Sequence, residues 1–172
     1  MTPQIALLIS EDGHVFRGYS WGATGCAMGK AVLNTSLSGY QAELTDPANA
    51  QSIIVMTSPH VGNVGVHAAD ALSDSYHARG LVVREPSRLA SNWQSEGELE
   101  PALARAGVVG IHRVDTRAIS QLIIAHPTLR FGIFSGASLP EAVADLNPTT
   151  PLPRSVIDTL IADVVSSGQE TA

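Results

Sequence analysis

The sequence predicts an α/β domain of mixed sheet topology with a C-terminal amphipathic helix. Its first third carries short apolar runs separated by Gly, Pro and Asp-Gly, a pattern typical of strands and turns. The segments that follow alternate between helical and strand periodicity, which indicates helices packed on a sheet. After Pro148, Pro151 and Pro153, apolar residues recur at helical spacing up to Val165.

The expected strands follow in chain order. Residues 5–10 and 15–21 are expected to form a hairpin around Asp12-Gly13, because glycine adopts the positive φ angle of a tight turn at little cost. The continuous apolar run at 53–56 predicts a buried central strand. Further strands are expected at residues 27–33, 80–84, 108–114 and 131–134.

Sequence signals also mark where helices should begin. A short helical turn is expected at residues 40–45. Ser95 followed by Glu98 resembles a capping box, which predicts a helix that closes at Gly107. Asp115 stands at an N-cap position before the next helix, and Ser138 with Glu141 repeats the capping pattern.

The chain divides into two parts by composition. Residues 1–147 are expected to form one domain, and residues 148–172 a Pro-rich linker followed by the C-terminal helix. The apolar stripe of this helix is expected to dock on its own domain, although its spacing also leaves partner binding or self-association open.

Composition excludes several classes of protein. A hydrophobic content of 44% suits a folded core, and a net charge of -6 with singly scattered basic residues argues against nucleic acid as a partner. The single cysteine, Cys26, cannot form an internal disulfide, which suits a cytoplasmic location. The apolar opening is too short to cross a membrane, so no membrane association is expected.

Uncharged polar side chains are crowded between Asn34 and Asp46, and a second polar loop surrounds His60. Buried polar groups need hydrogen-bond partners, so this density indicates a specified arrangement or a binding surface. For the His60 loop there are two interpretations: its polar side chains bond to nearby backbone groups, or they bind a ligand or partner. The first is slightly favoured. The candidate residues for binding a ligand or partner are Asn34, Ser36, Gln41, Asp46, His60 and Asn63.

Known catalytic patterns are missing. A glutaminase needs a cysteine on a sharp elbow beside a base, whereas Cys26 lies in a glycine-rich strand connection, so this chain is not expected to be a glutaminase. No Gly-rich phosphate cradle supports ATP binding. The spacing of His60, His67 and His77 matches no usual metal motif. We therefore assign no catalytic residue, no metal site and no cofactor.

Several sequence motifs resemble those of a known family. The polar block reads NTS-x-S-GYQ-x-x-LTDP, the second loop reads SPH-x-GN-x-G, and H-x-RGLVVRE, SNW and DTRA follow in order. Together they resemble the amino-terminal domain of the glutamine-dependent carbamoyl-phosphate synthetase small subunit, without its glutaminase domain. The resemblance runs from Ala6 to about Ser135 and implies a swivelling β/β/α domain. It also implies a role in arginine and pyrimidine biosynthesis, beside a large subunit that binds ATP.

Three departures from the family pattern carry information. The family motif reads TDPS, with a serine that touches the glutamine substrate, and Ala48 stands at that position. Lys30 replaces the usual glutamate after the second glycine, and Ser58 replaces the usual tyrosine before Pro-His. These changes, with an end near the start of the family's interdomain linker, favour a stand-alone paralogue.

The sequence is therefore compatible with two functions. The first is a non-catalytic structural and interaction domain that assembles with a synthetase large subunit or a separate glutaminase domain. As an enzyme it would be at most part of a glutamine-hydrolysing carbamoyl-phosphate synthase complex. The second is a stand-alone paralogue repurposed as a small-ligand binder or enzyme in a specialised pathway. There His60, the one neutral-pH acid or base among the candidates, would act with Asp46.

Overall fold

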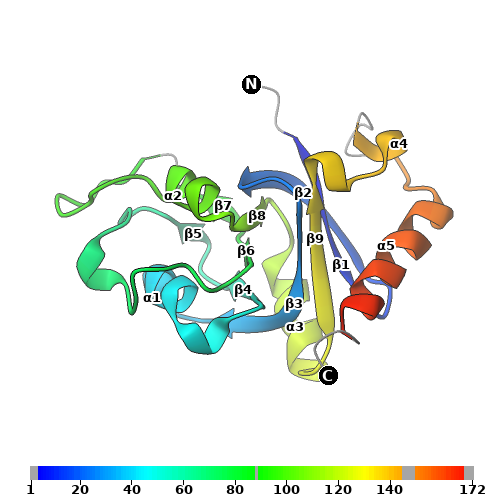
Figure 1. The fold of residues 1–172 in the computed structure, drawn as a ribbon, viewed down its shortest axis with the longest axis horizontal. Coiled ribbons are helices and arrows are strands. Elements are labelled where there is room, and N and C mark those ends of the chain that lie inside the picture. The colour runs from blue at the N-terminus through cyan, green and yellow to red at the C-terminus, as the bar shows by residue number, and fades with distance from the viewer. Residues whose placement is uncertain (1–3, 88, 145–149, 169–172) are drawn as a thin grey trace.

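The protein is built around a closed seven-stranded β-barrel (Figure 1). The structure, a computed structural model, describes residues 4–87, 89–144 and 150–168. Around the barrel the strands follow in the order β1-β2-β8-β6-β4-β3-β9. Their bounds are β1 Ile5–Ser10, β2 Val15–Gly22, β3 Cys26–Asn34, β4 Ser52–Met56, β6 Gly80–Val82, β8 Val109–His112 and β9 Arg130–Ser135.

The sheet topology is mixed, as the sequence predicts. β1 and β2 form the expected antiparallel hairpin, and Gly13 in its turn has a φ of 97°. Strand β4 lies between β3 and β6 and is parallel to both, which confirms it as a buried central strand. β9 pairs antiparallel with β1 on one side and with β3 on the other, and so closes the barrel.

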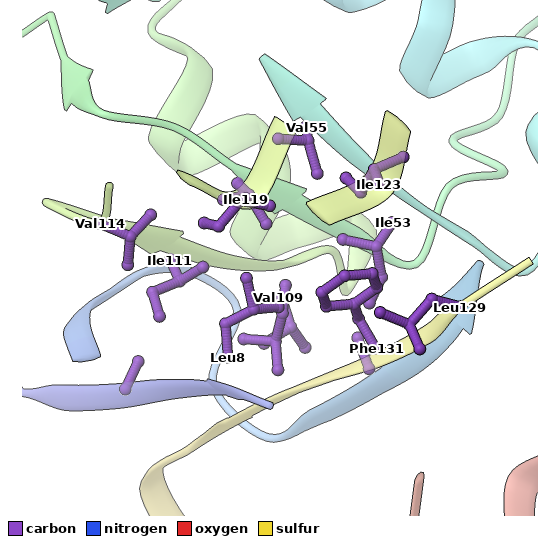
Figure 2. Packing of buried hydrophobic residues seen from close by; sticks show 14 residues of the cluster. Leu8, Ile53, Val55, Val109, Ile111, Val114, Ile119, Ile123, Leu129 and Phe131 are labelled. Atoms are coloured by element: carbon purple, nitrogen blue, oxygen red, sulfur yellow. The ribbon is translucent and has the colours of Figure 1, made fainter. Parts of the chain in front are cut away.

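The barrel interior holds the largest apolar cluster, shown in Figure 2. Alternate residues of each strand point inward, so Leu8, Ile53 and Phe131 meet there although they come from distant segments. Helix α3, Thr116–Ala125, adds Ile119 and Ile123 to the same cluster. The interior is thus a packed core rather than a cavity for a ligand.

Helices cover the outside of the barrel in two groups (Figure 1). Helices α1, Tyr40–Thr45, and α2, Leu99–Ala106, pack with the outward residues of β4 and β6. Helix α5, Arg154–Ser167, packs Leu160 and Val164 against the outer face of β1 and β9, beside the short α4, Glu141–Ala144. The C-terminal helix therefore docks on its own domain, as predicted.

Short elements complete the described chain. Strands β5, His60–Val61, and β7, Glu85–Pro86, form a separate two-stranded sheet. The 3-10 turns are η1, Pro47–Asn49, η2, Ala68–Asp70, and η3, Gly136–Ser138.

Two of the predicted helix starts are wrong. Helix α2 begins at Leu99 with Glu98 as its N-cap, whereas the Ser95 side chain bonds to the main chain of Gly97. Helix α4 begins at Glu141, while Ser138 lies in η3 and its hydroxyl donates to Gly25 O at 2.7 Å. In both places the serine hydroxyl also bonds to a nearby main-chain carbonyl, Gly97 O for Ser95 and Ser135 O for Ser138, which competes with helix capping.

Asp115 is the predicted cap that the structure confirms. Its Oδ1 accepts a hydrogen bond from Ala118 N at 3.0 Å, at the start of α3. Replacing Asp115 with alanine is expected to lower the free energy of unfolding by about 1 kcal/mol, because a first-turn N–H loses its acceptor. Asp115→Asn keeps an acceptor and should lose less than half as much in urea unfolding. Equal losses in the two variants would contradict a capping role.

The observed fold is a mixed α/β domain with a C-terminal helix. The swivelling β/β/α class implied by the resemblance stays a prediction, as does the boundary at residue 148. The start of the expected linker, at residues 148 and 149, lies outside the described residues. None of the helices in the described residues combines the length and the apolar character that a membrane span requires.

Candidate functional site

The polar block begins where β3 ends. The side chain of Asn34 is buried, and its Oδ1 accepts hydrogen bonds from Ser36 N at 2.7 Å and from the Ser36 hydroxyl at 2.5 Å. Ser36 Oγ in turn accepts from Gly39 N at 3.1 Å. The structure thus brings two predicted residues, Asn34 and Ser36, together in the turn that leads into α1. Their polar atoms shape the backbone there.

Helix α1 is fastened to the segment that follows the second polar loop. The Tyr40 hydroxyl donates to Gly65 O at 2.6 Å, and burial raises the pKa of Tyr40 to about 12. The phenol therefore stays protonated and can act as a permanent donor. The buried Gln41 accepts from His67 N at 2.9 Å through Oε1. These bonds hold two of the recognised sequence motifs in one fixed arrangement.

Asp46 organises the turn after α1. Its Oδ1 accepts from Ala48 N at 2.8 Å and caps η1. Ala48 itself is exposed, and its methyl side chain can form no hydrogen bond. The glutamine contact that the resemblance places at this position therefore has no side-chain group to make it.

Unlike Asn34 and Gln41, His60 and Asn63 both have exposed side chains. The main-chain oxygen of His60 accepts from the Ser58 hydroxyl, and that of Asn63 accepts from Ser91 N at 2.9 Å. Among the described residues no hydrogen bond or ion pair joins the imidazole of His60 to Asp46. Joint catalysis by this pair stays a prediction.

The most exposed large apolar side chain near this loop is Trp93, which is 89% exposed. It lies between two main-chain attachments: Ser91 N donates to Asn63 O at 2.9 Å, and Glu96 N donates to Val66 O at 2.8 Å. A held segment therefore displays an indole to solvent. In the sequence Trp93 is notable only as part of the SNW motif, because nothing there indicates that its side chain is exposed.

Cys26 has the chemistry of an unreactive thiol. Cys26 keeps an exposed surface, but partial burial raises its pKa to about 11, and the negative charge of Asp163 adds to the shift while Arg79 opposes it. Since the thiolate is the nucleophile, a thiol that stays protonated at neutral pH is poorly suited to attack a substrate. In the described residues, no group of three His, Cys, Asp or Glu side chains is placed to hold a metal ion.

Comparison with known proteins gives one consistent family. The family model described as carbamoyl-phosphate synthase small chain, CPSase domain, matches residues 8–133. The carbamoyl phosphate synthase small chain of Streptomyces coelicolor is 42% identical over 162 residues, which cover 94% of this chain and 43% of that protein. The small chain of Mycobacterium tuberculosis H37Rv is 40% identical over 166 residues, with 95% and 44% covered. The chain therefore spans less than half the length of these relatives.

Proposed function

The chain belongs to the family of carbamoyl-phosphate synthase small chains, and we propose that it is a non-catalytic assembly domain in carbamoyl-phosphate synthesis. The role of its polar residues supports this proposal. Asn34, Ser36, Gln41 and Asp46 all accept hydrogen bonds from the protein's own main chain, which suits shaping a surface. Through that synthesis the domain would serve arginine and pyrimidine production.

The partner we propose is the large chain of the synthase, or a separate glutaminase domain. The single observation that carries this is Trp93, with 89% of its surface exposed on a segment held by main-chain hydrogen bonds. A large rigid aromatic group is the side chain most often found at the energetic centre of a protein interface.

Replacing Trp93 with alanine is expected to weaken the complex with the synthase large chain by at least roughly tenfold, because interface tryptophans commonly contribute about 2 kcal/mol or more. The measurement is the mass of the mixture by light scattering, followed by a titration to obtain the dissociation constant. The unchanged chain should give a mass that is the sum of the two partners.

The matched control is Ile124→Ala. Ile124 is 70% exposed on α3, away from the Trp93 segment in Figure 1, so its removal should leave the complex unchanged. A chain that forms no complex with either the large chain or a glutaminase domain would overturn the assembly role. Equal weakening by both substitutions would remove Trp93 as the anchor.

A second function has one observation in its favour. His60 and Asn63 expose side chains on a loop whose main chain is fixed, while Ala48 lacks the family's substrate-contacting group. A domain repurposed to bind a small ligand would use that loop, with Asp46 as an additional candidate. An activity or ligand that survives replacement of both His60 and Asp46 with alanine would exclude this use of the loop.

A further inference from the structure

Three of the chain's ten basic residues meet in one groove on the outside of the barrel. The groove has a volume of about 770 Å³, and its floor is the outer face of β3. The end of α5 forms one wall, and the turn before β4 forms the other. Its principal lining residues are Cys26, Lys30, Gln51, Ser52, Arg79 and Arg130.

The strand register places these cations in a row. Lys30 of β3 lies directly opposite Arg130 of β9, and on its other side opposite Ser52 of β4. Beyond Ser52, on the side of β6, lies Arg79, the residue just before that strand. Its main-chain N–H donates to Ser52 O at 2.9 Å. Because alternate strand residues share a face, the outward side chains of four neighbouring segments converge here.

Among the side chains of the described residues that line the groove, this arrangement leaves positive charge unbalanced. Like charges directly opposite one another across two strands are destabilising, and Lys30 with Arg130 is such a pair. No carboxylate is among the described residues that line the groove, and none forms an ion pair with Lys30, Arg79 or Arg130. A concave surface concentrates such a field, which attracts anions.

Three negatively charged or electronegative groups lie near the groove: the carboxyl end of α5, Glu11 and Asp163. The α5 carboxyl end would repel an anion, but Arg130 Nη2 donates to Ser167 O at 3.3 Å and so satisfies that carbonyl. Glu11 accepts from Arg130 N, outside the groove lining. Asp163 is near enough to raise the pKa of Cys26, but it does not line the groove either.

We propose that this groove binds a small molecule with at least two negative charges, carried by phosphate groups or clustered carboxylates. Guanidinium groups match both kinds of oxygen with paired N–H donors, and lysine adds a point charge. The volume is in the range of small-ligand sites, larger than a single phosphate needs. This site is independent of the assembly role, since it lies on other residues.

The test is a calorimetric titration with pyrophosphate and, separately, with citrate at low ionic strength. Lys30→Gln and Arg79→Gln are each expected to weaken binding roughly tenfold, because each removes a charge-assisted hydrogen bond. Arg117→Gln is the matched control: it makes the same change of charge at an exposed position of α3, outside the groove. Tighter binding of pyrophosphate identifies a phosphorylated ligand, and tighter binding of citrate a polycarboxylate.

Cys26 gives an independent readout of location, since it is the chain's one cysteine and lines the groove. A bound anion should slow its alkylation by excess iodoacetamide, followed over hours because the raised pKa of Cys26 leaves little thiolate, and Lys30→Gln should remove that protection. Absence of binding by both probes at millimolar concentration would overturn the proposal. Equal weakening by Arg117→Gln, or unchanged alkylation of Cys26, would also overturn it, since binding would then be unspecific surface attraction.

Discussion

Replacing Phe131 with alanine is expected to lower the free energy of unfolding by about 3–5 kcal/mol, the usual cost of removing a buried ring. Phe131 is 1% exposed, and Figure 2 shows its ring inside the barrel cluster. Its neighbours there come from several strands and from α3, so the barrel cannot collapse around the cavity without shifting paired strands. Urea unfolding, followed by circular dichroism, measures the loss.

The control for this substitution is again Ile124→Ala, which removes an apolar side chain that is 70% exposed. Its effect should stay within about 0.5 kcal/mol, as for most surface changes. A loss of similar size in both variants would mean that the interior of the barrel contributes no special stability at Phe131. If the surroundings filled the cavity, Phe131→Ala would lose well under the roughly 3 kcal/mol expected.

Replacing Gly29 with alanine is expected to destabilise the protein by about 3 kcal/mol or more, since overpacking against main chain cannot be relieved by a rotamer change. A Cβ atom at Gly29 would lie 2.0 Å from Gln51 O and 3.0 Å from Gln51 C. Both are main-chain atoms at the entry to β4, so β3 and β4 would have to separate. The urea midpoint measures the effect.

Gly97→Ala is the matched control, because the added Cβ would meet only Val66 Cγ2, at 3.6 Å, an ordinary contact distance. This variant should unfold close to the unchanged chain. Should Gly29→Ala unfold at the same urea concentration as Gly97→Ala, the close approach of β3 to the Gln51 main chain would be refuted. Gly29 also faces Phe131 across β3 and β9, so the two large effects are not expected to add.

Local features of the fold could be predicted from local sequence. The Asp12-Gly13 turn, the apolar run of β4 and the Asp115 cap each depend on a few neighbouring residues. Closure of the barrel could not be predicted in this way. The periodicity of β9 shows that it is a strand, but says nothing of its pairing with both β1 and β3.

In the candidate sites, too, features set by neighbouring residues could be predicted, whereas features set by strand pairing could not. Crowded polar residues correctly indicated a specified hydrogen-bonded arrangement, because Asn34 and Gln41 are buried and bonded. Basic residues that stand singly in the sequence give no sign of a cluster in space. Lys30, Arg79 and Arg130 come together through strand register, which sequence proximity cannot reveal.

The place of β9 between β1 and β3 also bears on how the protein is made. A chain emerging from the ribosome can pair β1 with β2, and β3 with β4, well before Arg130–Ser135 has been synthesised. Until then β1 and β3 each present an unpaired edge, which can join the edge of another nascent chain. Translation pauses or truncations before Ser135 should therefore yield aggregates, and synthesis of β9 should be the step that closes the barrel and removes both edges.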